Sequence, residues 1–174
     1  MKIIDCTTYH SEDLMMDIRF NILNEYVDKF IVTESKFSHS GNPKPLKFNI
    51  NNFPKFKDKI RYLVIENEPK DLIQKNNISS SEKRINSILR IEQSYNYMMK
   101  SIEDASDNDL ICYSDNDEIP NFESKQFKKS KKNIFIFKQL FFYYKFNLFY
   151  DLMPWHGTKA CKKKKLVSLR LFHK

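Results

Sequence analysis

Three carboxylates follow directly on a short apolar segment in the middle of the chain. Residues 110–113 (Leu-Ile-Cys-Tyr) are bounded by polar residues, which is typical of a buried strand, and Asp115, Asp117 and Glu118 follow after Ser114. In open α/β sheets, ligands bind beyond the carboxyl ends of the strands. Paired carboxylates are hard oxygen ligands that suit Mg²⁺ or Mn²⁺. The pattern therefore indicates a metal-assisted site for a nucleotide diphosphate, with an acidic turn that caps the next helix as the alternative.

The segments around this motif alternate between strand and helix patterns, as in an α/β fold with a largely parallel core sheet. Ser11 followed by Glu12 predicts a side-chain cap for the first helix. An aromatic run occupies residues 134–150, and a loop rich in helix-breaking residues occupies 38–45. We expect strands over residues 3–7, 29–34, 60–65, 110–113 and 166–172, and helices over 12–26 and 81–102.

The composition limits how a phosphate could be held. The chain of 174 residues has only two glycines, Gly41 and Gly157, which excludes the glycine-rich phosphate loops of Rossmann and Walker type. The three cysteines lack metal-site spacing, so we expect reduced, buried thiols. No apolar span of membrane length is present, and the chain enters a strand at its start. We therefore predict a cytoplasmic protein.

The charge is unevenly distributed along the chain. Residues 1–120 hold 16 Lys and Arg against 20 Asp and Glu, whereas residues 121–174 hold 14 against 2. Such a basic segment suits a phosphorylated substrate or peripheral contact with an anionic membrane. The alternative is a compositional bias, because the lysines accompany abundant Asn, Ile and Phe. We do not expect a nucleic-acid partner.

Several further motifs occur in the order of a known family. Together they resemble glycosyltransferase family 17, whose members include β-1,4-mannosyl-glycoprotein 4-β-N-acetylglucosaminyltransferases. The resemblance covers residues 2–120 and weakens beyond them. It rests on Asp5-Cys6, Ser11-Glu12, residues 17–20 (Asp-Ile-Arg-Phe), residues 32–35 (Val-Thr-Glu-Ser), residues 37–46 (Phe-Ser-His-Ser-Gly-Asn-Pro-Lys-Pro-Leu) and residues 114–120 (Ser-Asp-Asn-Asp-Glu-Ile-Pro).

The resemblance implies a single GT-A-like α/β domain, with a mostly parallel central sheet flanked by helices, that binds a nucleotide sugar. Residues 1–120 would form the donor-binding half and residues 121–174 a basic, aromatic, acceptor-side segment. The implied donor is UDP-N-acetylglucosamine and the implied acceptor a glycan or polysaccharide. Asp117 would be the principal ligand of Mn²⁺ or Mg²⁺. Asp115 would face the donor ribose or a metal-bound water, and Glu118 would support the site.

Four more residues match the family on the donor side. Asp5 and Glu34 end the first two predicted strands, where a nucleoside would lie. Arg19 would contact the diphosphate or, alternatively, form a structural ion pair. For Asp5 the alternative is helix capping. Lys44, in the loop containing Gly41, would contact a phosphate; the loop would gate the pocket or only stabilise the fold.

The chain departs from the family in two places. A Gln-Arg-Asn run is replaced by residues 93–96 (Gln-Ser-Tyr-Asn), so Arg84 or Arg90 would have to supply the cation. A C-terminal Gly-Gly-Trp-His-Phe-Ser motif is missing, and we expect a chain that lacks the C-terminal part. Trp155 and His156 instead become candidates for the acceptor side, Trp155 by sugar stacking.

Two alternatives to a metal-dependent glycosyltransferase stay open. One is a non-catalytic remnant that binds the donor or acts as a basic interaction module. The other is a nucleotidyltransferase, which also uses paired aspartates with a metal. Neither a catalytic base, which an inverting transfer requires, nor the stereochemical outcome can be assigned from the residues.

Overall fold

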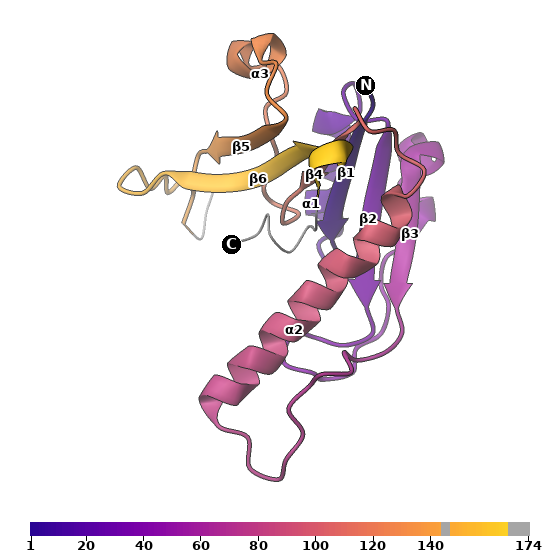
Figure 1. Ribbon diagram of the computed structural model, residues 1–174, viewed down its shortest axis with the longest axis vertical. Helices are drawn as coiled ribbons and strands as arrows, with labels where there is room; N and C mark the ends of the chain where they lie inside the picture. Colours follow the sequence, from indigo (N-terminus) through magenta and orange to yellow (C-terminus); the bar gives the residue numbers. More distant parts are fainter. Residues whose placement is uncertain (144–146, 167–174) are drawn as a thin grey trace.

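The computed structural model describes residues 1–143 and 147–166 (Figure 1). The helices are α1 (Asp13–Leu23), α2 (Ser80–Met99) and α3 (Lys125–Lys129). The strands are β1 (Ile3–Thr8), β2 (Lys29–Ser35), β3 (Ile60–Ile65), β4 (Leu110–Tyr113), β5 (Ile134–Gln139) and β6 (Trp155–Lys162). Short 3₁₀ turns occupy Ile50–Asn52, Pro54–Lys59, Lys100–Ile102 and Lys163–Lys165.

One sheet contains all six described strands, in the order β3-β2-β1-β4-β6-β5. The first four are parallel to one another, whereas β6 runs antiparallel to both β4 and β5. The sheet is therefore mixed. The predicted parallel arrangement applies to β1–β4, and the antiparallel pair was not foreseen.

Apolar residues of the parallel strands lie on both faces of the sheet, and a helix covers each face. Alternate residues of β1 and β4, such as Ile3 and Leu110, pack with Phe20 of α1. The intervening residues, such as Ile4 and Ile111, pack instead with the C-terminal half of α2. Figure 1 shows α2 lying across one face of these strands. This double coverage explains why the strands read as apolar runs rather than as alternating patterns.

The helix starts differ from the sequence predictions. Helix α1 begins at Asp13 without a side-chain cap, because the Glu12 carboxylate accepts hydrogen bonds from the backbone N–H groups of His10 and Ser11. The prediction of a side-chain cap at Ser11 was therefore wrong. Helix α2 begins with a complete capping box between Ser79 and Glu82, which the sequence contains but which was overlooked.

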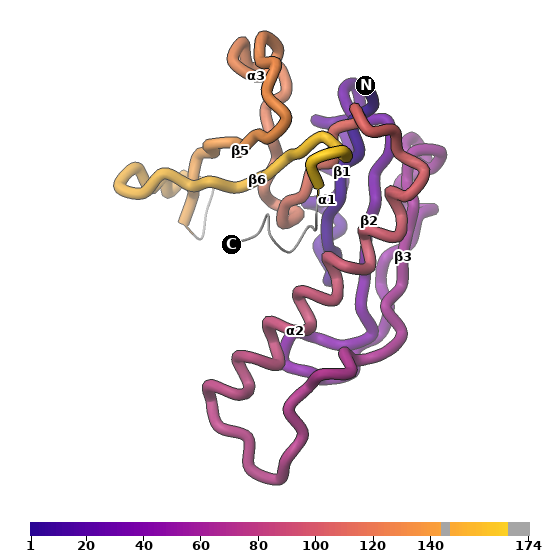
Figure 2. The backbone as a smooth tube through the Cα atoms, viewed as in Figure 1, coloured from indigo at the N-terminus to yellow at the C-terminus, as the bar shows by residue number. Residues whose placement is uncertain are grey.

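Strands β5 and β6, with the described residues 140–143 and 147–154 that connect them, form an arm beside the parallel strands. Figure 2 shows β5 and β6 running together away from β1–β3. The ring of Phe127 in α3 lies 5.1 Å from that of Phe135 and 5.5 Å from that of Phe137, so α3 packs on one face of the arm. The aromatic run predicted over 134–150 thus contributes a strand only at its start. The predicted strand over 166–172 lies outside the described residues except Leu166, which is not in a strand.

The three cysteines Cys6, Cys112 and Cys161 are buried and unpaired, as predicted. Burial raises the pKa of the Cys6 and Cys112 thiols, which keeps them protonated and unreactive. Among the described residues, no helix is both long and apolar enough to cross a membrane.

Gly157 allows β6 to pass close to its neighbours. A Cβ atom there would lie 1.5 Å from Oε1 of Gln139 and 3.2 Å from Cδ of Glu118. The same Gln139 oxygen accepts a hydrogen bond from the buried Thr158 N–H at 3.1 Å. A side chain at position 157 must therefore displace Gln139 and leave the Thr158 donor without its acceptor.

We expect Gly157→Ala to lower the free energy of unfolding by about 1–3 kcal/mol, because a buried donor loses its partner. Chemical denaturation should show a smaller cost for the same change in a Gln139→Ala background, where the clash and the hydrogen bond are already gone. Equal costs in the two backgrounds would contradict this role of Gln139.

Candidate functional site

A pocket of about 1100 Å³ opens beyond the carboxyl ends of the parallel strands. Thr8 at the end of β1 and Ser35 at the end of β2 contribute to its wall. The wall also contains Asp115, Asn116 and Asp117 after β4, Lys44 and His39 in the loop after β2, and Lys83, Arg84, Ser87 and Arg90 of α2.

The pocket brings opposite charges together. Asp115 and Asp117 are exposed and line it from the loop after β4. Lys83 and Arg84 are exposed and line it from the first turns of α2. The cavity therefore offers carboxylate oxygens for a cation and basic groups for an anion within a single space.

Arg19 lies beneath the loop after β4, residues 114–118, which we call the acidic loop, and Arg19 is fully buried. Its Nε and Nη2 atoms donate to the two oxygens of Asp5 at 2.8 and 2.6 Å, and Nη2 also donates to Oγ of Ser114 at 2.5 Å. Burial alone lowers the pKa of Arg19, but the charge and hydrogen bonds of Asp5 outweigh it and raise that pKa. The two side chains are 0% and 1% exposed, and neither is among those that line the pocket.

The remaining nitrogen of Arg19 holds the acidic loop by its backbone. Nη1 donates to the carbonyl oxygens of Asp115 at 3.2 Å, Asn116 at 3.3 Å and Glu118 at 3.0 Å. Three carbonyls that point at one guanidinium fix the path of the loop, while Asp115 and Asp117 line the pocket. The geometry of Arg19 is thus that of a structural ion pair, which was the alternative raised from its sequence position.

Glu118 connects the acidic loop to the arm. Its carboxylate accepts from Nε1 of Trp155 at 2.8 Å and from the backbone N–H of Asp115 at 3.1 Å. Its carbonyl accepts from Oγ1 of Thr158 at 2.7 Å. Burial, with the charges of Asp115 and Asp117, raises the pKa of Glu118 against the opposing hydrogen bond from Trp155. Glu118 therefore supports the loop from behind rather than lining the pocket.

Trp155 and His156 lie on the arm. The indole of Trp155 stacks on Phe141, with ring centroids 5.1 Å apart and planes 17° apart. His156 is exposed and pairs across the strands with Lys138. Neither residue lines the pocket, so a role on the acceptor side stays a prediction.

Glu34 is buried and anchors the loop after β2. It accepts from Nζ of Lys44 at 2.6 Å, from the backbone N–H of Lys47 at 3.0 Å and of Phe48 at 3.1 Å, and from the hydroxyl of Tyr62 at 2.7 Å. Burial raises the pKa of Glu34, but the hydrogen bonds from Lys44, Tyr62 and the backbone outweigh it and lower that pKa. Lys44 reaches the pocket wall with its ammonium already paired.

Arg90 joins the loop after β2 to α2. It donates to both oxygens of Glu68, at 2.7 and 2.9 Å, and to the carbonyl of His39 at 3.2 Å. Gly41 adopts φ +92, and a Cβ atom there would lie 2.4 Å from Nη2 of Arg90. The glycine therefore permits both the turn and the close approach of Arg90. Arg84, in contrast, makes no ion pair with any described residue.

The side chains fit a metal ion only when it is shared with a substrate. Within the described ranges, no three His, Cys, Asp or Glu side chains lie close enough to hold a metal ion together. Mg²⁺ in nucleotide sites is typically bound by one or two carboxylates and completes its shell with water and substrate phosphates. Asp115 and Asp117 match that smaller requirement.

Sequence reasoning found the acidic loop but missed two parts of its surroundings. It did not place Lys83 or Ser87 in the pocket, although the Ser79 capping motif marks where their helix begins. It also missed His39, whose pKa is lowered by burial and by the neighbouring His10.

We expect Arg19→Met to lower the free energy of unfolding by about 3–5 kcal/mol, because the Asp5 charge would stay buried without a partner. Lys29→Met, which breaks an exposed ion pair with Asp104, is the control and should cost less than about 1 kcal/mol. Urea denaturation measures both. Similar small costs for the two variants would contradict the structural role of Arg19.

Glu34 should contribute to the acid sensitivity of the fold. Because its folded-state pKa lies below the ordinary value of 4.5, its carboxylate stabilises the fold above that pH. The contribution is lost as the pH falls through the lower, folded-state value. Glu34→Gln should therefore reduce stability at neutral pH and flatten the stability loss below pH 4.5, whereas the exposed Glu25→Gln should change neither. Parallel acid limbs for wild type and Glu34→Gln in thermal melts would contradict the assignment.

Comparisons with known proteins agree with the resemblance seen in the motifs. Proteins named beta-1,4-mannosyl-glycoprotein 4-beta-N-acetylglucosaminyltransferase from Homo sapiens and Rattus norvegicus are each 33% identical to this chain over 72 residues. That segment is 39% of this chain but only 14% of the human and 13% of the rat protein, so the match spans a small part of their length. The family model for glycosyltransferase family 17 matches residues 1–168. Since that match runs over nearly the whole chain, this protein belongs to glycosyltransferase family 17.

Proposed function

We propose that this chain forms the donor site of a metal-dependent glycosyltransferase that uses a nucleotide sugar. The observation that carries the proposal is the pocket in which Asp115 and Asp117 share one cavity with Lys83 and Arg84. A nucleotide diphosphate presents the charges that such a cavity complements, since its phosphates bind a cation and also accept hydrogen bonds from basic side chains.

The fold gives this site the position expected of a nucleotide-sugar domain. Strands β1, β2 and β4 are parallel, and the pocket lies at their carboxyl ends, where open α/β sheets bind ligands. Helices cover both faces of these strands. These features support a GT-A-like organisation.

Each residue of the site has a distinct task in the proposed reaction. Asp117, with Asp115, would hold Mg²⁺ or Mn²⁺, which supplies positive charge to the departing diphosphate. Arg84 would contact the same diphosphate, because its guanidinium has no competing ion pair among the described residues. Arg19 and Glu118 would keep the acidic loop in place before any ligand arrives.

The donor is proposed as UDP-N-acetylglucosamine and the acceptor as a glycan. The names of the matching mammalian proteins describe transfer of N-acetylglucosamine to a mannosyl glycoprotein. Since the matched segment covers only a small share of those proteins, donor and acceptor for this chain both require measurement.

Calorimetric titration of UDP-N-acetylglucosamine into the purified chain tests the donor site. We expect heat of binding with Mn²⁺ and little or none after chelation, because the ion would be bound by the carboxylates and the diphosphate together. Equal binding with and without metal would contradict the metal-dependent site. Tighter binding of UTP than of UDP-N-acetylglucosamine would contradict sugar transfer and indicate nucleotidyl transfer instead. Absence of binding under every condition would contradict the donor site altogether.

Asp117→Asn should lower the metal-dependent affinity about 10- to 100-fold, because a neutral amide loses the charge-assisted contact to the cation. Asp58→Asn is the matched control, since Asp58 is also exposed but lies in the 3₁₀ turn Pro54–Lys59, away from the pocket. Unfolding midpoints should be unchanged in both variants. An Asp117 variant that binds the donor as the control does would overturn the assignment of the metal ligand.

A further inference from the structure

Exposed apolar side chains are concentrated at the end of the arm. Asp151 is the only charged residue that the structure describes between positions 140 and 153. We call the described residues of this segment, 140–143 and 147–153, the apolar tip. Six of its side chains are between 45% and 80% exposed: Leu140, Tyr143, Leu148, Phe149, Leu152 and Met153.

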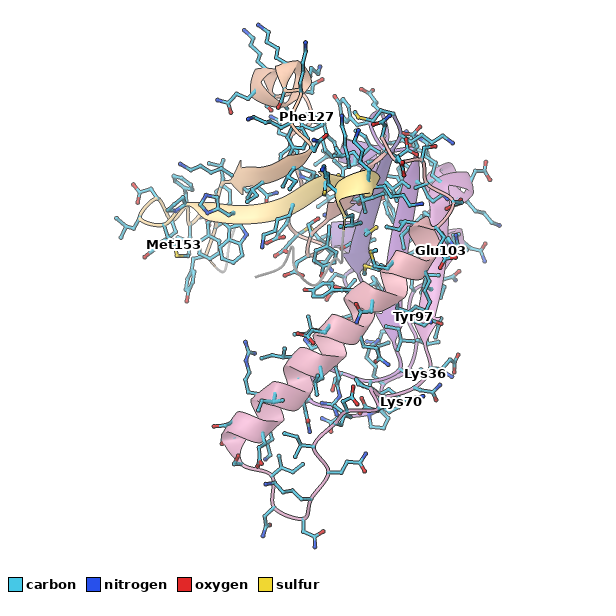
Figure 3. The ribbon with its side chains drawn as sticks, in the orientation of Figure 1. Lys36, Lys70, Tyr97, Glu103, Phe127 and Met153 are labelled. Atoms are coloured by element: carbon cyan, nitrogen blue, oxygen red, sulfur yellow. The ribbon has the colours of Figure 1, made fainter. Side chains whose placement is uncertain are left out.

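The apolar tip is held out from the body of the protein by a hydrogen-bonded ribbon. Figure 3 shows Met153 at the far end of the arm, away from the parallel strands. The backbone N–H of Tyr143 donates to the carbonyl of Leu148 at 2.9 Å, and Phe142 forms a β-bridge with Phe149. Paired backbone at this point reduces the cost of placing the segment in an apolar medium, where unpaired N–H and C=O groups are expensive.

Basic side chains lie along the same arm. Lys138 of β5 is exposed, and so are Lys128 and Lys129 of α3 and Lys131 and Lys132 between α3 and β5. The whole segment 121–174 holds 14 Lys and Arg against 2 acidic residues. Aromatic and aliphatic side chains flanked by lysines are the combination that interfacial segments use against anionic lipid headgroups.

We propose that the arm docks on the surface of an anionic lipid bilayer, with the apolar tip in the headgroup region and the lysines against the lipid phosphates. The charge of the arm favours this partner over a neutral one. A projecting tip also suits penetration of a lipid surface better than a stable protein interface, which buries about 800 Å² on each partner. The hydrogen bond from Trp155 to Glu118 ties the docked arm to the acidic loop.

Vesicle binding tests the proposal with a probe that the chain already contains. Trp155 is the only tryptophan of the chain, and it lies on the arm next to the apolar tip. Vesicles of phosphatidylcholine alone and of phosphatidylcholine with phosphatidylserine should be compared at low and high salt. We expect flotation with the anionic vesicles that weakens with salt, and quenching of Trp155 fluorescence by brominated lipid.

Two double variants test whether vesicle binding depends on the apolar tip or on exposed apolar side chains anywhere on the protein. Leu152→Asp with Met153→Asp should lower the vesicle partition coefficient about tenfold or more, since apolar contact is lost and repulsion from the lipid is added. Leu14→Asp with Ile22→Asp is the control on α1, where these side chains are 75% and 51% exposed, and it should bind as wild type does. Titration of UDP-N-acetylglucosamine should be the same for both variants, so loss of docking is distinguishable from loss of the donor site.

Three outcomes would overturn the proposal. The first is wild-type protein that does not float with anionic vesicles. The second is a tip variant that floats as well as the α1 control. Light scattering that shows a dimer of wild type and a monomer of the tip variant, without vesicle binding, would assign the apolar tip to self-association.

Discussion

The buried charge of Arg19 is the constraint on which the rest of the site depends. A guanidinium with no solvent contact must find all its partners within the protein, and here it finds a carboxylate from β1, a hydroxyl and three carbonyls from the loop after β4. Those bonds fix the backbone of the loop, and Asp115 and Asp117 of that loop line the pocket. The acidic loop is therefore held by contacts from within the protein itself.

Other parts of the fold reinforce the same loop from different directions. β6 inserts between β4 and β5, and its Thr158 and Trp155 reach the loop through Glu118. On the other side of the pocket, Glu34 and Arg90 hold the loop after β2. The basic wall on α2 is built differently, because Lys83 and Arg84 are exposed and can adjust to a ligand. The acidic side of the pocket is therefore held by hydrogen bonds within the protein, whereas the basic side consists of exposed side chains.

The acidic loop could be located from the sequence because a short apolar run that ends in carboxylates is typical of a buried strand leading into a polar site. Family membership could be predicted from ordered motifs, and the comparisons confirmed it. The role of Arg19 could only be offered as one of two alternatives, since its carbonyl partners lie 96 to 99 positions away in the chain. β6 was missed because its residues 155–162 mix glycine, histidine and lysine with few apolar side chains. Its burial depends on the edge of β4, which is a tertiary property.

Electron paramagnetic resonance of Mn²⁺ tests most directly whether the acidic loop and a nucleotide diphosphate form one metal site. Free Mn²⁺ should be counted in the presence of the protein alone, UDP alone and both together. Within the described part of the chain no third ligand joins these two carboxylates, so we expect weak Mn²⁺ binding to the protein alone. UDP should raise the affinity for Mn²⁺ about 5-fold or more, and Mn²⁺ should raise the affinity for UDP by the same factor. Mn²⁺ binding that UDP does not change would contradict a shared site and leave Asp115 and Asp117 as parts of an acidic turn.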